Sequence, residues 1–181
     1  DTVTEVMWVT GAALFIRLAD YREVGGLDGH FFAHMEEIDL CWRLRSRGKK
    51  LVCIPQSVVY HVGGATLKKE NPRKTFLNFR NNLLMLYKNL PDKELEHVLF
   101  IRGILDRVAA LVFYLKKDRA NARAVMQARR EFEDIRYSFA ASRIENMMKS
   151  TDEIIPERTH FSIVMKYYLL GKKHFSQLKL F

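Results

Sequence analysis

Cysteine and proline are scarce in this chain, and several common catalytic signatures are missing. Of the 181 residues, two are cysteine and four are proline. Cys41 and Cys53 lie in apolar segments and form no Cys-x-x-Cys pair, which predicts buried thiols in a reducing compartment. Zinc-ligand spacing, a P-loop, a His-Glu-x-x-His helix and a Gly-x-Ser-x-Gly elbow are also missing, which argues against the metalloprotease, NTPase and serine-hydrolase classes.

The sequence also lacks a clear membrane-spanning run. The best candidate, 98–115, contains Arg102, Asp106 and Arg107, and each charge costs roughly 2.5 to 3.5 kcal/mol at the centre of a bilayer. A spanning helix is therefore not expected. The spacing of its apolar residues favours packing on neighbouring helices, and the alternative is a helix that lies on a membrane surface beside the cations of 116–123.

The composition is that of a folded, basic protein. Hydrophobic residues make up 48% of the chain, enough for a sizeable core. The formal net charge of +9 favours an anionic partner, such as a nucleotide diphosphate, an anionic lipid surface or a nucleic acid. The chain opens at Asp1 with strand-like sequence and no signal peptide, so we expect it to be part of a longer protein.

Up to about residue 66 the pattern is that of an α/β protein. The segment 6–17 is almost continuously apolar and predicts a buried strand, in which Gly11 marks a place where another group approaches the backbone. Further elements are expected here: a short helix over 18–24, a glycine turn over 25–29, and strands over 50–54 and 58–61.

From residue 71 onward the pattern is helical. Asn71 followed by Pro72 predicts a helix start, with asparagine as the N-cap and proline at the first position. Apolar spacing predicts helices over 71–90, 93–117, 122–149 and 161–170. In the second of these, the predicted core stripe consists of Val98, Ile101, Leu105, Val108, Val112 and Leu115.

The most informative stretch places an aromatic pair before two adjacent carboxylates. Glu36 and Glu37 stand where a loop turns into a short amphipathic helix that should end at Gly48. Asp39 and Arg43 have the spacing of a helical ion pair. The expected faces of the helix are Ile38, Cys41 and Trp42 toward the core, and Glu36, Asp39 and Arg43 on the other side. A carboxylate at such a helix start, beside an apolar wall, is well placed to accept a proton.

Several short motifs occur in a fixed order along this part of the chain. They are Val9-Thr10-Gly11-Ala12, Val24-Gly25-Gly26-Leu27-Asp28, Phe31-Phe32, the run from Met35 to Arg43, and Tyr60-His61-Val62-Gly63-Gly64. Together they resemble the second half of a family 2 glycosyltransferase of the inverting, rhamnosyltransferase-like branch. The resemblance implies an α/β fold: the second half of a GT-A domain over 1–70, then a helical appendage over 71–181, mostly helical overall.

The resemblance also implies a mechanism. In such enzymes one carboxylate of an acidic pair deprotonates the acceptor hydroxyl, which attacks the anomeric carbon of a nucleotide sugar with inversion. Glu37 falls on the position of the base, although the usual pair is Glu-Asp and this one is Glu-Glu. Glu36 would orient the acceptor or support the base. The expected substrate-binding residues are Trp8 and Gly11, with Asp39 and Arg43 as supports; Trp8 could equally be a buried strand aromatic.

A divalent cation, Mg or Mn, is implied for the complete enzyme, where it would neutralise the leaving diphosphate. His61 matches a histidine that completes the metal site in some relatives, and Gly63-Gly64 would leave room for phosphate. On its own, His61 would more often be a hydrogen-bonded residue at a strand end. The family's Asp-x-Asp motif and nucleotide-binding strands belong to its first half. We therefore expect this fragment to lack the donor site, to bind no cation and to be inactive alone.

The implied partners are a nucleotide-sugar donor and a glycan or lipid-linked acceptor, at a cytoplasmic location with peripheral contact to the inner face of the membrane. A sheet edge left unpaired would favour self-association. The alternative is a non-enzymatic basic helical module that binds an anionic membrane surface or nucleic acid, with Glu36 and Glu37 merely solvated at a helix start. Nucleic acid is not expected, because the cations are scattered over several helices without a base-reading motif.

Overall fold

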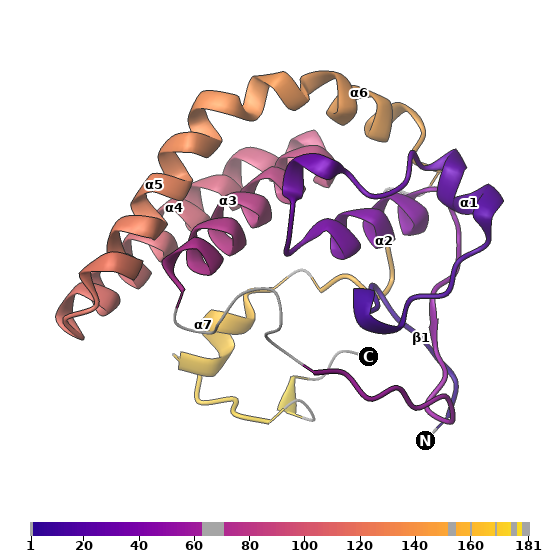
Figure 1. The fold of residues 1–181 in the computed structure, drawn as a ribbon, viewed down its shortest axis with the longest axis horizontal. Coiled ribbons are helices and arrows are strands. Elements are labelled where there is room, and N and C mark those ends of the chain that lie inside the picture. Colours follow the sequence, from indigo (N-terminus) through magenta and orange to yellow (C-terminus); the bar gives the residue numbers. More distant parts are fainter. Residues whose placement is uncertain are drawn as a thin grey trace.

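The protein is a layered set of helices with a small two-stranded sheet at one end (Figure 1). The computed structural model describes residues 2–62, 71–151, 155–159, 161–168, 170–174 and 177–178. Its helices are α1 (Leu18–Glu23), α2 (Glu36–Ser46), α3 (Pro72–Asn89), α4 (Asp92–Leu115), α5 (Arg119–Ile135), α6 (Ala140–Met148) and α7 (Ile163–Tyr168). Its strands are β1 (Thr4–Glu5) and β2 (Val52–Cys53), and three 3₁₀ turns cover Gly11–Ala13, Gly29–Phe31 and Arg136–Phe139.

The N-terminal segment contains less strand than its apolar sequence predicts. β1 pairs antiparallel with β2, and the Val6 N–H still donates to the Leu51 carbonyl at 3.0 Å. No strand continues over 7–17 of the described chain, so the predicted buried strand over 6–17 is wrong. Thr10 interrupts the run because its hydroxyl accepts the Ala12 N–H and starts a 3₁₀ turn, and Phe15 is 90% exposed. The predicted strand over 58–61 is wrong too, because the segment is exposed and unpaired within the described residues.

The helix starts agree better with the sequence. Asn71 caps α3 by accepting the Arg73 N–H, and Pro72 occupies the first turn as predicted. The predicted helix over 122–149 is instead α5 and α6, separated by the 3₁₀ turn at 136–139. The Ser138 hydroxyl donates to the Ile135 carbonyl in that turn, a local bond that competes with the α-helical pattern.

The core stripe predicted for α4 is confirmed only in part, because Val98 packs against the hydrophobic core and Ile101 and Leu105 are half-buried. The inward residues are Leu95, Leu99, Gly103, Asp106 and Ala110, whereas Val108, Val112 and Leu115 are exposed. Asp106 is buried because it pairs with Arg129 of α5 at 2.9 Å. Gly103 lies beside this pair, and a Cβ added there would come within 3.2 Å of the Arg107 guanidinium and 3.5 Å of the Arg129 guanidinium. A buried ion pair between helices has therefore rotated α4 relative to the position that its apolar residues alone would favour.

One hydrophobic core joins the helices to the N-terminal part. Phe31 and Trp42 pack in the same cluster as Leu83, Leu99 and Phe132. A second, smaller cluster lies behind α2 and consists of Val24, Leu40, Cys41, Leu44 and Leu51. We predicted a domain boundary near residue 70. Residues 63–70 lie outside the described residues, so this boundary stays a prediction.

The two cysteines have different environments. Cys41 is buried in α2, as predicted, whereas Cys53 is exposed on β2, so the prediction of two buried thiols is wrong for the second. Burial raises the pKa of the Cys41 thiol. In the part of the chain that the structure describes, no helix combines the length and the apolarity needed to cross a bilayer.

Candidate active site

The loop that leads into α2 has an unusual backbone. Phe32, His34 and Met35 have φ values of 63°, 70° and 75°, a region that residues other than glycine seldom adopt. Asn81 of α3 holds this loop, because its amide nitrogen lies 2.8 Å from each of the carbonyl oxygens of Phe31, Ala33 and His34. Strained backbone of this kind costs of order 1 to 3 kcal/mol per residue and persists where the surroundings enforce it, often at functional sites.

Asp39 lies at the centre of a buried polar network behind this loop. Its carboxylate accepts hydrogen bonds from Arg43, from Lys88 Nζ at 3.0 Å and from Asn89 at 2.8 Å. Arg43 pairs with it at 2.8 Å, which confirms the predicted ion pair. Asp39 and Arg43 are 0% and 5% exposed, so their predicted position on the side of α2 opposite the core is wrong. Lys88 and Asn89 of α3 make the burial of Asp39 possible, and Arg43 is buried against Asp39 and the glycine turn; the apolar pattern of α2 does not reveal these partners.

Arg43 also holds the glycine turn. It donates to the carbonyl oxygens of Val24 and Gly26, the latter at 2.8 Å. Gly26 has φ +68°, and an added Cβ would lie 2.9 Å from the Tyr21 ring, so the turn requires glycine here. With these contacts Asp39 and Arg43 are removed from solvent. They are placed to support the loop and the turn, and their part in substrate binding stays a prediction.

Glu36 and Glu37 occupy the first turn of α2, as predicted. One carboxylate oxygen of each is buried without a hydrogen-bond partner among the described residues, and so is Nε2 of His34. Buried polar atoms of native proteins are rarely left unpaired, so this cluster of three is a candidate for binding a ligand hydroxyl. Burial raises the pKa of Glu36, and the neighbouring charge of Glu37 adds to the effect.

Gly11 lies beside the acidic pair. A Cβ added to Gly11 would come within 3.7 Å of Glu37 Cβ, so the structure brings together these two predicted site residues. Trp8, on the same segment, is 47% exposed. The alternative of a buried strand aromatic is therefore wrong for Trp8, and its indole remains free to contact a ligand.

The predicted metal ligand is not placed in a metal site. His61 is exposed at the end of the described range 2–62, and Gly63-Gly64 lies outside the described residues. Within the described chain, no three His, Cys, Asp or Glu side chains are grouped so that they could hold a metal ion. The role of His61 stays a prediction.

Reasoning from the sequence missed the residues of α3 that support the site. Arg80 donates to the His30 carbonyl at 3.0 Å, and Lys88 Nζ lies 2.7 Å from Asp28 and 5.0 Å from the centre of the Phe31 ring. Lys88 has 2% of its side chain exposed. The signal in the sequence was a polar residue at an inward position of an apolar helix, at Asn81 and again at Lys88.

Comparison with known proteins finds relatives of one class of enzyme. A pre-mycofactocin glycosyltransferase from Mycobacterium tuberculosis is 31% identical over 141 residues, which are 72% of this chain and 29% of that protein. The N-acetylglucosaminyl-diphospho-decaprenol L-rhamnosyltransferase of the same species is 38% identical over 56 residues, covering 31% of this chain and 18% of the relative. The rhamnosyltransferase WbbL of Escherichia coli K12 is 36% identical over 61 residues, 34% of this chain and 22% of the relative.

These relatives are glycosyltransferases, and the chain is related to that class of enzyme. It spans less than a third of the length of the relatives it matches, 29% for the first of them. No family model matches the sequence. No solved structure matches it either.

Proposed function

We propose that this chain is the acceptor side of an inverting, family 2-like glycosyltransferase of the GT-A fold. The enzyme would transfer a sugar from a nucleotide-sugar donor to a glycan or lipid-linked acceptor. The observation that carries the proposal is the acidic pair at the start of α2, with one unpaired buried oxygen on each carboxylate beside Gly11. The glycosyltransferase relatives support the reaction class, and their greater length leaves room for a donor-binding part elsewhere in the protein.

In the proposed reaction Glu37 accepts the proton of the acceptor hydroxyl. The acceptor oxygen forms a bond to the anomeric carbon of the donor, and the bond from that carbon to the nucleoside diphosphate breaks on the opposite face. Glu36, whose pKa is raised by burial, would form a hydrogen bond with the acceptor. The proposed steps are those of this chain's own residues, and the divalent cation implied for the complete enzyme stays a prediction. The contacts of Asn81 and Lys88 would keep the acidic loop in one geometry before the substrate binds.

Replacement of the base tests the proposal. In the complete protein, Glu37→Gln should reduce transfer by about 10²-fold or more while donor binding is retained, because general base catalysis contributes roughly 10² to 10⁴-fold. Transfer of labelled sugar from a panel of nucleotide sugars to glycan and lipid acceptors measures the rate, and calorimetry measures donor binding.

The matched control is Glu96→Gln, an exposed position on α4. This variant should transfer sugar at the unmodified rate. Full activity of Glu37→Gln would exclude Glu37 as the base, and loss of donor binding together with activity would indicate a structural role instead.

The second candidate function is binding to an anionic membrane surface, which one face of α4 favours. The exposed apolar residues of this face follow one another at three- and four-residue spacing: Phe100, Ile104, Val108, Leu111 and Leu115, each at least 50% exposed. The cations Lys116, Lys117 and Arg119 follow directly along the chain. The apolar stripe would contact the acyl chains of an anionic bilayer, and the neighbouring cations would contact its headgroups. Such contact would suit a lipid-linked acceptor.

Vesicle flotation tests this surface. Ile104→Gln together with Leu111→Gln should weaken binding to vesicles of phosphatidylglycerol and phosphatidylcholine by about tenfold or more, because burial of each side chain contributes roughly 1.5 to 3 kcal/mol. Met126→Gln, an exposed apolar residue of α5, is the matched control and should bind normally. Binding to an oligonucleotide but not to vesicles would favour the nucleic-acid alternative, and unchanged flotation of the double variant would exclude this face.

A further inference from the structure

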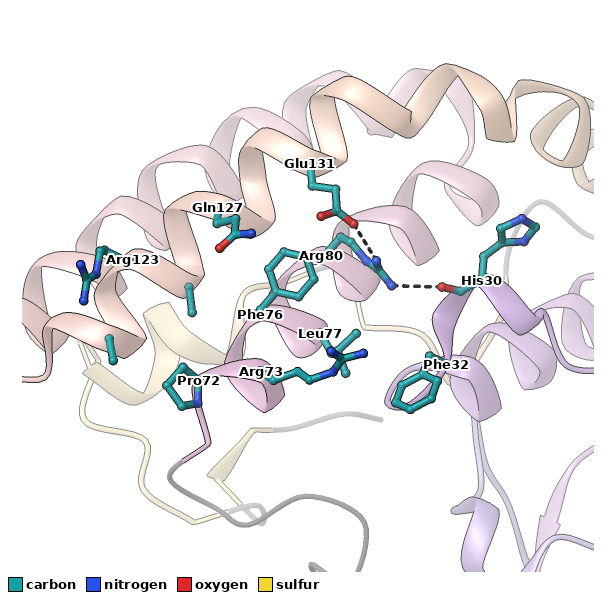
Figure 2. A pocket seen from close by; sticks show the side chains of 12 residues that line it. His30, Phe32, Pro72, Arg73, Phe76, Leu77, Arg80, Arg123, Gln127 and Glu131 are labelled. Atoms are coloured by element: carbon teal, nitrogen blue, oxygen red, sulfur yellow. Dashed lines mark hydrogen bonds and ion pairs between the residues drawn. The ribbon is translucent and has the colours of Figure 1, made fainter.

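We propose that a pocket between α3, α5 and the loop before α2 binds a diphosphate group. The pocket has a volume of about 660 Å³, within the range of ligand sites. Figure 2 shows Arg73 and Arg80 of α3 and Arg123 of α5 around it, with the Phe76 ring between Arg123 and Arg80 and the Phe32 ring beyond Arg73.

The starts of two long helices meet at this pocket. Pro72 and Arg73 in the first turn of α3 line it, and so do Ala120 and Arg123 at the start of α5. Helix N-termini carry partial positive charge and favour anions, particularly phosphate groups. At α3 this backbone contribution has the same sign as that of the three arginine side chains, whereas at α5 the Asp118 carboxylate already accepts the Asn121 N–H.

The pocket contains one carboxylate, and that group is already paired. Glu131 lies 2.7 Å from Arg80, whose guanidinium also donates to the His30 carbonyl (Figure 2). Arg80 is therefore fixed in the pocket wall. Arg73 and Arg123, in contrast, make no ion pair with any described residue. Two unpaired guanidinium groups beside a fixed one suit a ligand with two phosphates, because arginine binds phosphate oxygens bidentately.

The aromatic rings indicate what the diphosphate is attached to. Phe32 is 66% exposed and lies in the strained loop, where its backbone has a positive φ. The loop holds the Phe32 ring at the pocket, and the centre of the ring lies 5.4 Å from the guanidinium carbon of Arg73. Phe76 lies 5.3 Å from the Arg80 guanidinium. An exposed ring can pack against a sugar, a base or a prenyl chain. The diphosphate could thus belong to a lipid-linked substrate or to a nucleotide, and the shared group is what the pocket recognises.

This inference goes beyond the proposed function. His30 and Phe32 of the pocket precede Glu36 and Glu37 on the same loop, so a bound diphosphate would lie on the loop that positions the acidic pair. Binding of a diphosphate does not require Glu37 to be a base. A binding assay without sugar transfer therefore allows either proposal to fail without the other.

Calorimetric titration of the chain at low salt with inorganic pyrophosphate, farnesyl diphosphate and UDP tests the pocket. Arg73→Gln and Arg123→Gln should each weaken pyrophosphate binding about tenfold or more, because each removes charge-assisted hydrogen bonds. Arg130→Gln, on α5 but outside the pocket, should bind as the unmodified chain does. Tighter binding of farnesyl diphosphate than of UDP would assign the pocket to a lipid-linked substrate, and the reverse order to a nucleotide.

A second measurement needs no variant. Bound pyrophosphate should protect Arg73 and Arg123, but not Arg130, from modification by phenylglyoxal, as mapped by mass spectrometry. The proposal would be overturned if pyrophosphate failed to bind to the unmodified chain. It would also be overturned if both pocket variants bound pyrophosphate as tightly as the unmodified chain does and neither arginine were protected.

Discussion

Charged side chains are part of the interior at the candidate site. Asp39 is 0% exposed and Lys88 is 2% exposed. An isolated buried charge is costly, and these groups are tolerated because each meets opposite charge and hydrogen-bond donors or acceptors at close range. Asp28 completes the group: burial opposes its ionisation, but the Lys88 ammonium and the bonds from His30 outweigh this and lower its pKa to about 2.

The pKa of Asp28 predicts a dependence of stability on pH. Because the folded-state pKa of about 2 lies below the ordinary value of 3.8, ionised Asp28 stabilises the fold above pH 4, and this contribution is lost as the pH falls toward 2. The free energy of unfolding falls as the pH drops toward 2, and Asp28→Asn should make this fall smaller by about 1 to 2 kcal/mol, allowing for partial screening by solvent. Urea unfolding between pH 2 and pH 5 measures it.

The control for the pH experiment is Asp134→Asn, an exposed carboxylate on α5. It should leave the slope of stability against pH nearly unchanged. Equal slopes for Asp28→Asn and the unmodified chain would show that Asp28 does not contribute in this pH range.

At the scale of elements, α3 is the helix that orders the site. Arg80 and Asn81 hold the loop before α2, and Lys88 and Asn89 hold Asp39 within α2. The other end of α3 is held in turn by α6, because Arg143 donates to the carbonyl oxygens of Tyr87 and Leu90. These carbonyls have no partners within a helix that ends there, so the arginine satisfies them. In Figure 1, α6 accordingly continues from α5 across α3.

Removal of the Asn81 amide should destabilise the fold through the loop. Asn81→Ala leaves the carbonyl oxygens of Phe31, Ala33 and His34 without this donor, and we expect the free energy of unfolding to fall by about 2 to 3 kcal/mol. Equilibrium urea denaturation measures the change.

Asn78→Ala is the matched control, because among the described residues the Asn78 amide donates within α3, to the Lys74 carbonyl. It should cost less than about 1 kcal/mol. Equal losses for the two variants would mean that helix propensity, and not the loop contacts, determines the effect of Asn81.

At the scale of the whole molecule, the acidic loop, the arginine pocket and the exposed face of α4 all belong to elements that pack on the same hydrophobic core. The core includes Phe31 and Trp42 from the N-terminal part and residues of α3, α4 and α5, so the acidic loop rests on the helices. The pocket with Arg73 and Arg123 opens beside that loop. The exposed apolar face of α4 is the surface proposed to contact a membrane. The proposed base, diphosphate pocket and membrane surface thus belong to elements that share one core.

Local chemistry made part of this structure predictable. The start of α3 at Asn71 and Pro72 follows from capping, and the range of α2 follows from its apolar spacing and from Gly48 after its last turn. The Asp39–Arg43 pair was predictable because i,i+4 neighbours on a helix always approach each other. The acidic pair could be identified as a candidate site from adjacent motifs that stand together in the sequence.

Only the tertiary structure determined which charges are buried and which apolar faces are exposed. Asp106 turned inward because Arg129 of α5 was there to meet it, and α4 consequently exposed residues that its own pattern would place in the core. Lys88 and Asn81 became internal because carboxylate and carbonyl groups of a distant segment required partners. The sequence by itself determined the start of α3 and the range of α2; the rotation of α4 and the polar contacts of the site depended on neighbours far away in the chain, which no local spacing encodes.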